Sequence, residues 1–120
     1  MNDRYLFRGR RLDKGNEGEW IIGYIQMRPT HKNPVIDYVQ VDPATVGQCT
    51  GLKDKNGVLI YESDIIKDDY GRNFRVVYNQ QKTQFEAAPT YSFMYSLDLC
   101  EVIGNVHENV EILVGRSVTE

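Results

Sequence analysis

Four acidic side chains between residues 62 and 69 have a spacing that could support metal-dependent chemistry: Glu62, Asp64, Asp68 and Asp69. Converging carboxylates hold Mg²⁺ or Mn²⁺ in nucleases, and Glu62 and Asp64 would share one face of a strand. The structural interpretation is that Asp64 accepts backbone N–H bonds where a strand begins. Asp68 and Asp69 would then form a turn before Gly71. We favour the structural interpretation, and we expect no metal ion and no other cofactor.

A second group of polar residues, Asp54, Asn56 and Gly57, imitates part of a calcium-binding loop. An EF-hand-like loop aligned on Gly57 would place Leu52 and Ser63 at its first and twelfth positions, and neither can supply a carboxylate. The dipeptide Asn-Gly instead favours the positive φ values of a tight hairpin turn. We therefore predict a turn at residues 54–57, followed by a strand over Val58–Tyr61.

Nucleophilic and acid–base chemistry would depend on two histidines and two cysteines: His31, His107, Cys49 and Cys100. Both histidines fall in predicted loops, and the cysteines lack the C-x-x-C spacing of a zinc site. We expect the cysteines to be buried as small hydrophobic residues. The sequence contains no Gly-rich phosphate loop and no G-x-S-x-G motif. We predict that the protein is not an enzyme.

Binding has better candidates. The chain has eight tyrosines and one tryptophan, residue types that anchor interfaces. We select Tyr91, Phe93 and Tyr95, in an irregular segment, as one candidate surface; the alternative is that these rings fill the core. Arg8, Arg10 and Arg11 form a second, basic surface that could meet phosphates or pair with residues 62–69 of another copy.

The partner that we favour is an unidentified protein or a second copy of the chain. A single-stranded nucleic acid could instead bind Arg8, Arg10, Arg11 and Lys32 with nearby rings. The net charge of −3 argues against duplex nucleic acid. We expect no membrane partner, because no apolar run is long enough to span a bilayer. The N-terminal residues lack the apolar stretch of a signal peptide, so we expect a cytoplasmic protein.

The elements that must position these residues are mostly strands, because the apolar residues alternate with a period of two. Strands are predicted around Tyr5 and Phe7 and over residues 20–25, 35–41, 58–61, 65–66, 73–79, 85–87 and 102–106. Residues 20–25 are apolar on both faces, which indicates a central strand. Asp42-Pro43 predicts one turn of helix at most. Residues 89–100 are ambiguous between strand and loop, with a strand favoured through Leu97 and Leu99.

These strands, separated by frequent turns, predict a mainly β fold, either a small barrel or a curled antiparallel sheet. A length of 120 residues with 41% hydrophobic and 26% charged residues is typical of one globular domain. We therefore predict a single domain over residues 1–120, with at most short helical turns.

Three stretches of the sequence closely resemble the YopX family of bacteriophages and prophages. They are Phe7-Arg8, the central residues Thr45–Gln48, Thr50–Leu52, Asp54, Asn56, Gly57, Ile60–Glu62 and Asp64-Ile65, and the closing residues Glu101–Asn105 and Glu108-Asn109. The resemblance covers nearly the whole chain. It implies a fold that contains an SH3-type β-barrel and a phage or prophage accessory protein without an established activity.

We interpret the shared residues as builders of backbone bends and strand contacts rather than as ligand-binding groups. The structural set is Gly47, Gln48, Gly51, Asp54, Asn56, Gly57, Tyr61, Asp64, Gly104 and Asn105. Cys49 stands where the family usually has an aromatic residue, and Ser63 where it usually has glycine. Serine tolerates positive φ poorly, so we expect an ordinary backbone at Ser63. The sequence therefore favours a non-enzymatic interaction module; a single-strand binder and, less favoured, a divalent-metal hydrolase are the alternatives.

Overall fold

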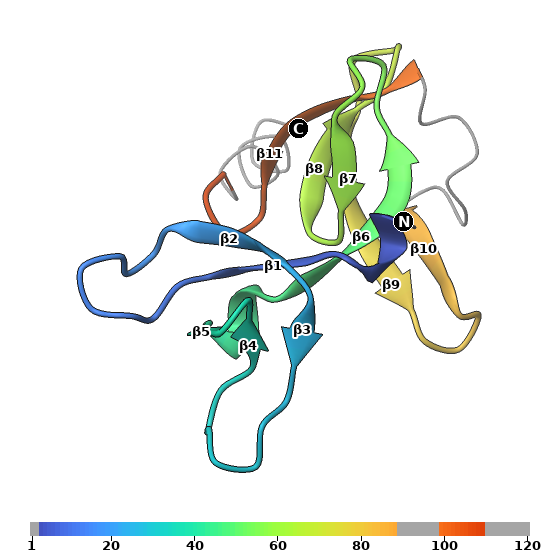
Figure 1. Cartoon of the computed structure of the whole chain (residues 1–120). Coiled ribbons are helices and arrows are strands. Elements are labelled where there is room, and N and C mark those ends of the chain that lie inside the picture. Colours follow the sequence, from blue (N-terminus) through green and yellow to red (C-terminus); the bar gives the residue numbers. More distant parts are fainter. Residues whose placement is uncertain (1–2, 89–98, 110–120) are drawn as a thin grey trace. The chain divides into compact units, whose positions relative to one another are not determined.

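A computed structural model of the chain describes residues 3–88 and 99–109 (Figure 1). Every strand pairing between these residues is antiparallel, and two 3-10 turns are present, η1 (Asp3–Tyr5) and η2 (Pro43–Thr45). The prediction of a mainly β protein is confirmed. The chain divides into two compact units, Met1–Gly51 and Leu52–Glu120, and each is described by itself. The single domain stays a prediction. Within the described ranges, no helix has the length and apolar character needed to cross a membrane.

In unit 1, β1 (Phe7–Arg10) lies between β2 (Trp20–Gly23) and β6 (Gly47–Lys53), the strand in which unit 1 ends. A second sheet has β4 (Val35–Ile36) between β3 (Ile25–Gln26) and β5 (Val39–Gln40). The buried apolar side chains are Val35, Ile36, Val41 and Cys49. Gly9 of β1 leaves room for this core, because a Cβ there would lie 3.0 Å from Val41 Cβ.

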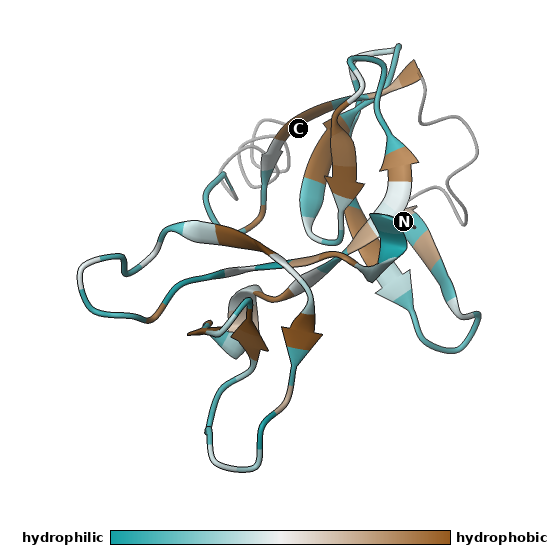
Figure 2. Cartoon of the chain, in the orientation of Figure 1, coloured by the Kyte–Doolittle hydropathy of each residue, from teal (hydrophilic) through white to brown (hydrophobic). Residues whose placement is uncertain are grey.

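Unit 2 contains β7 (Leu59–Tyr61) and a sheet in the order β10-β9-β8-β11. Its strands are β8 (Asp64–Lys67), β9 (Asn73–Asn79), β10 (Gln84–Ala88) and β11 (Glu101–Asn105). Figure 2 shows apolar residues along β7 and β8. The core consists of Ile60, Ile66, Phe74, Val76, Ala87 and Cys100, with Phe85 and Val102 packed against it. Burial of these side chains is the main stabilising contribution to this unit.

The SH3-type barrel implied by the family resemblance, and the small barrel that the strand pattern left open beside a curled sheet, are not confirmed. In the sheet of unit 2, β10 and β11 are two separate ends, and none of the sheets formed by residues 3–88 and 99–109 closes on itself. Closure requires the first and last strands to hydrogen-bond to each other, and a period-two pattern carries no information about that long-range pairing.

Two strand predictions were wrong in position. Tyr5 lies in η1, and the first strand begins at Phe7. Residues 20–25 do not form a central strand, because β2 ends at Gly23 and pairs with β1 alone among the described strands. Ile22 consequently points to solvent and is 51% exposed. The apolar composition of this segment therefore reflects an apolar surface rather than burial on two faces.

The predicted strand over residues 35–41 is two strands joined by a tight turn. Ile36 pairs with Val39, and the two residues between them, Asp37 and Tyr38, have φ values of 47° and 70°. Both are in the left-handed region that glycine and asparagine normally fill in such hairpins. Tyr38 is an aromatic residue there, which costs about 1–2 kcal/mol. Asp37 reaches back to Gly23, where its carboxylate occupies the space that a Cβ would need.

Other local predictions are confirmed. Asp42 caps η2 by accepting the Ala44 N–H at 3.0 Å, and the helix ends after one turn. The strand predicted over residues 73–79 is β9. The strand favoured through Leu99 is wrong at that residue, because Leu99 and Cys100 precede β11 and are not in a strand. The remaining predictions for residues 89–98, including Leu97, lie outside the described residues.

The strain at Tyr38 can be measured by comparing glycine with alanine at the same position. At position 38, Tyr38→Gly should be up to about 1 kcal/mol more stable than Tyr38→Ala in urea unfolding, because only glycine fits the positive φ. Tyr70 provides the control, since it lies in a turn without positive φ. There the order should reverse, with Tyr70→Gly less stable than Tyr70→Ala by about 0.5–1 kcal/mol. The same order at both positions would contradict the strain.

Candidate functional site

Asp54 organises the turn between β6 and β7. The Asp54 N–H donates to the Val58 carbonyl at 2.9 Å, and the Gly57 N–H donates to the Asp54 carbonyl at 3.0 Å. Oδ1 of Asp54 accepts the N–H groups of Asn56 and Val58, at 2.8 and 2.9 Å. Gly57, not Asn56, takes the positive φ, at 80°. The predicted turn is thus present, and its carboxylate is an internal acceptor of backbone hydrogen bonds.

The second oxygen of Asp54 fixes a distant strand of the same unit. Oδ2 accepts the N–H of Val102 in β11 at 2.9 Å, and the Lys55 N–H donates to the Cys100 carbonyl at 2.9 Å. The Asp54 side chain is 5% exposed. One carboxylate therefore joins a local turn to a strand that follows it by 48 residues.

Asp68 builds the same turn between β8 and β9. Its N–H donates to the Arg72 carbonyl at 2.9 Å, and Gly71, with φ of 80°, donates to the Asp68 carbonyl at 3.1 Å. Oδ1 accepts the N–H groups of Tyr70 and Arg72, at 3.0 and 2.8 Å. Oδ2 accepts Nε of Arg72 at 2.8 Å. This equivalence was not predicted, although the shared spacing D-x-x-G at residues 54–57 and 68–71 was its signal in the sequence.

The turn between β7 and β8 corrects one prediction. Ser63 has φ of 77°, so the backbone here does require the left-handed conformation that the family usually gives to glycine. Its N–H donates to the Val76 carbonyl at 2.8 Å, and its carbonyl accepts the Val106 N–H at 2.9 Å. Oδ2 of Asp64 accepts the Tyr61 N–H at 2.7 Å, as expected. These long-range bonds hold Ser63 in place despite its Cβ.

The closing motif of the family surrounds Gly104. A Cβ at Gly104 would lie 2.5 Å from Oδ1 of Asn109, which also accepts the Asn105 N–H at 3.3 Å. Oδ1 of Asn105 accepts the N–H groups of His107 and Glu108, at 3.0 and 3.1 Å. The side chains of Asn105 and Asn109 thus stabilise the turn that follows β11 by accepting backbone hydrogen bonds.

The remaining family residues contact β1 and η1 in unit 1. Gly47 pairs with Arg8, and Nε2 of Gln48 donates to the Arg4 carbonyl at 2.8 Å. Gly51 has φ of 81°, and Arg4 Cγ lies 2.5 Å from the place where its Cβ would be. These residues, too, shape the backbone.

The candidate metal ligands are not arranged as a site. The Asp64 carboxylate, in a residue that is 2% exposed, accepts the Tyr61 N–H. The Asp68 carboxylate accepts the backbone N–H and the Nε of Arg72. Asp69 is exposed in that turn, and Glu62 lies in the turn after β7. Among residues 3–88 and 99–109, no group of three histidine, cysteine or acidic side chains could hold a metal ion.

The histidines and cysteines are placed by different elements. His31 lies in the loop between β3 and β4, where Nδ1 is 3.2 Å from the Thr30 hydroxyl, and His107 lies in the turn after β11. Cys49 and Cys100 are buried thiols, one in each unit, and neither forms a disulfide. The prediction that the cysteines are buried is confirmed.

The predicted basic surface contains an aromatic ring that sequence analysis did not place. Arg10 pairs with Trp20 across β1 and β2, and Arg8 pairs with Ile22, so these four side chains share the outer face of the two strands. The guanidinium carbons of Arg8 and Arg10 lie 5.0 and 5.2 Å from the centroid of the Trp20 ring. The signal in the sequence was alternation, which puts Arg8 and Arg10 on one face and Gly9 on the other.

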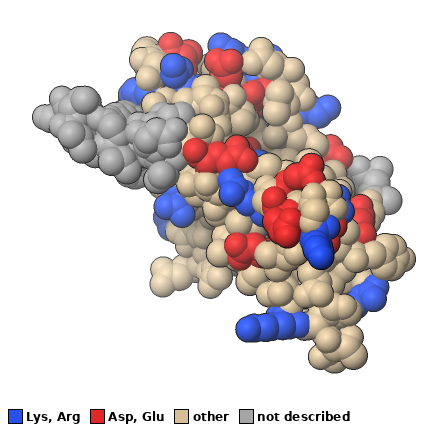
Figure 3. Space-filling view, turned by 90° about the vertical axis from the view of Figure 1, so that its left-hand side faces the viewer, with Lys and Arg blue, Asp and Glu red and all other residues tan. Residues whose placement is uncertain are grey.

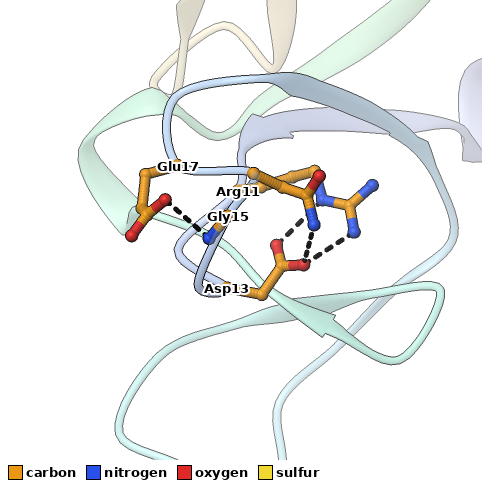
Figure 4. A network of polar contacts seen from close by, with 5 residues as sticks. Arg11, Asp13, Gly15 and Glu17 are labelled. Atoms are coloured by element: carbon orange, nitrogen blue, oxygen red, sulfur yellow. Dashed lines mark hydrogen bonds and ion pairs between the residues drawn. The ribbon is translucent and has the colours of Figure 1, made fainter.

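Arg11 does not extend this surface as a separate cation. Its Nε and Nη2 donate to Asp13 at 2.8 and 2.7 Å (Figure 4). The hydrogen bonds to Arg11 and then to Asn16 hold the pKa of Asp13 well below its ordinary value, and the bond to Asp13 raises the pKa of Arg11. Arg11 therefore stabilises the loop between β1 and β2 rather than presenting its charge to a ligand.

Exposed apolar side chains continue along this part of unit 1. Ile22 and Tyr24 alternate along the chain and are 51% and 45% exposed. On the face of the molecule in Figure 3, acidic and basic side chains are mixed, with no broad area of one sign. Tyr91, Phe93 and Tyr95 lie outside the described residues. The candidate site in the described chain is therefore the outer face of β1 and β2, formed by Arg8, Arg10, Trp20 and Ile22, with Tyr24 beyond it.

This geometry defines a small antiparallel β protein whose most distinctive sequence motifs build its turns. The model of the YopX protein family matches residues 7–114, and the chain belongs to the YopX family. Among solved structures, the chain is similar to protein EF1440 from Enterococcus faecalis, with 27% identity and a TM-score of 0.51, covering 88% of this chain and 86% of that one. No match was found among curated proteins.

The Asp54 carboxylate makes a pH-dependent contribution to stability. Burial raises its pKa, but the hydrogen bonds from Val102, Val58 and Asn56 outweigh burial, so the pKa lies below the ordinary 3.8. Its contribution is therefore complete above pH 3.8 and is lost as the pH falls through the lowered value.

Asp54→Asn should lower the free energy of unfolding at pH 7 by about 2 kcal/mol, because an amide nitrogen would face the Val102 N–H if Oδ1 kept its two bonds. Urea unfolding from pH 7 to pH 2 measures this loss, which should shrink below about pH 4. Asp69→Asn, at an exposed turn position, should change stability by less than about 0.5 kcal/mol. Equal effects of the two substitutions would contradict the role of Asp54.

Proposed function

We propose that this chain is a non-enzymatic phage or prophage accessory protein, acting in the bacterial cytoplasm as an interaction module that binds a protein partner through the outer face of β1 and β2. The observation that carries the proposal is the exposed side chain of Ile22, 51% exposed, next to the partly buried Trp20 ring and two arginines. Tryptophan, tyrosine and arginine are the residue types that dominate binding energy at protein interfaces.

The turns also support the proposal, because they use carboxylates that could otherwise have served catalysis. The residues shared with the family that could have done chemistry, above all Asp54 and Asp64, accept backbone hydrogen bonds. Asp68, outside the shared motif, does the same. A carboxylate that gives up such bonds to coordinate a metal ion would leave buried N–H groups unsatisfied. The cost of that exchange favours binding over hydrolysis as the activity of this chain.

A charge placed on the proposed face should remove binding without unfolding the protein. In co-purification from host cells, Ile22→Lys should capture at least about ten-fold less partner than the wild type, because burying a lysine without a counter-ion at an interface is costly. Val58→Lys is the matched control, since Val58 is 48% exposed in the other unit. Both variants should keep the wild-type Tm to within a few degrees. Equal loss for both, or a monomer without any partner, would refute the proposal.

A second candidate, a single-stranded nucleic acid, is favoured by one observation. The guanidinium groups of Arg8 and Arg10 beside the Trp20 indole combine phosphate-binding and stacking groups on one surface. Trp20 is the one tryptophan of the chain, so its fluorescence reports directly on this face.

Titration with a single-stranded oligonucleotide over a salt series tests this candidate. If it binds, the affinity should fall steeply with salt, and Arg8→Gln together with Arg10→Gln should reduce the slope of log K against log salt by about 1.4. Arg11→Gln should leave the slope unchanged, because Asp13 already neutralises Arg11. If the Trp20 fluorescence does not change at low salt, binding of single-stranded nucleic acid to this face is refuted.

A further inference from the structure

Tyr38 combines backbone strain with almost complete exposure. It sits at the tip of the β4–β5 hairpin with φ of 70°, and its side chain is 87% exposed. The guanidinium carbon of Arg28 lies 5.4 Å from the centroid of its ring. Burial of a large ring normally offsets an unfavourable backbone, but this ring is not buried among the described residues. Within that part of the chain, the strain is therefore not offset by packing.

Tyr70 shows that an exposed, arginine-stacked tyrosine does not need such strain. It is 79% exposed in the β8–β9 turn, with the guanidinium carbon of Arg72 5.3 Å from its ring centroid. In that turn Gly71 takes the positive φ, and Tyr70 does not. The two tyrosines thus differ mainly in their backbone. At position 38, the tip of the hairpin carries tyrosine in a backbone conformation that glycine would adopt without strain.

The surroundings of Tyr38 indicate the chemistry of what it meets. Arg28 lies in the loop between β3 and β4, which also carries Lys32 and His31 and contains no acidic residue between positions 27 and 34. The nearest carboxylate in sequence, that of Asp37, is directed at Gly23. A single projecting ring beside a cation matches an anchor that fills one pocket, rather than the row of rings along which a nucleic-acid strand stacks.

We propose that Tyr38 is an anchor residue whose ring enters an apolar pocket on the partner protein, with carboxylates of that partner at the rim of the pocket to meet Arg28. This inference rests on the proposed function, since it names the contact and the charge of the same protein partner. The partner is identified by its chemistry: an acidic surface that surrounds a pocket large enough for a phenol ring.

The test begins with photocrosslinking of the full chain in host cells. A benzophenone amino acid replaces Tyr38, Tyr70 or Ile22 in turn. A defined protein adduct from position 38, and none from position 70, is expected. The captured protein is then purified, and its affinity for the full chain and its variants is measured by calorimetry.

Tyr38→Gly should weaken binding by at least about thirty-fold, as for a tyrosine hot spot, and Tyr38→Phe should stay within about three-fold. Tyr70→Gly, the matched control, should bind as the wild type does. Because glycine relieves the backbone at position 38, loss of binding by Tyr38→Gly cannot be attributed to unfolding if its Tm is at least that of Tyr38→Ala. Arg28→Gln should slow association and reduce its dependence on salt.

Several outcomes would refute the proposal that Tyr38 is an anchor residue. They are an absence of adducts at position 38, equal adducts at positions 38 and 70, or wild-type affinity for Tyr38→Gly. If position 22 yields an adduct and Tyr38→Gly still binds that protein normally, the proposed function stands and the anchor alone fails. If neither position 22 nor position 38 yields an adduct, both proposals fail.

Discussion

Hydrogen bonds from backbone N–H groups to side-chain oxygens fix the turns that join the strands of unit 2. Asp54 accepts three such bonds, two within its own turn and one from Val102 in β11. Asp68 accepts two backbone N–H bonds within its own turn, as Asp54 does. The Asn105 side chain likewise accepts two backbone N–H bonds in the turn after β11. Charged acceptors make strong hydrogen bonds, and buried N–H groups left without a partner are costly. The short strands of the sheet are therefore joined by turns that cannot easily adopt another conformation.

This constraint separates architecture from recognition in the chain. The carboxylates of Asp54, Asp64 and Asp68, which could have suggested catalysis, accept backbone hydrogen bonds. The residues of the family motif mostly shape turns or leave room for a neighbouring side chain. Gly104, over which Asn109 lies, is one example, and Gly51, over which Arg4 lies, is another. In unit 1, arginines lie against the aromatic rings of Trp20 and Tyr38, and neither ring belongs to these turns. Membership of the YopX family is thus carried largely by residues that form the scaffold.

Two aromatic rings of unit 1, Trp20 and Tyr38, each have arginine stacked on them. Arg8 and Arg10 lie over Trp20, and Arg28 lies over Tyr38. A guanidinium over a ring covers part of the apolar surface while it stays hydrated, so the ring remains soluble and yet available for burial against another molecule. This explains how a small β protein can expose such rings, which would otherwise favour aggregation.

Features that depend on neighbouring residues could be predicted from the amino-acid sequence. The turn at Asp54–Gly57, the cap of η2 by Asp42 and the alternation of β9 follow from local hydrogen bonds and φ preferences. Three other features became clear only in the folded chain: which strand lies at an edge, that residues 35–41 fold back on themselves, and that Ser63 takes a positive φ. These outcomes depend on long-range partners, such as Val76 and Val106 for Ser63, which a local pattern does not identify. The outer face of β1 and β2 became visible for the same reason, because it depends on the pairing of Arg10 with Trp20.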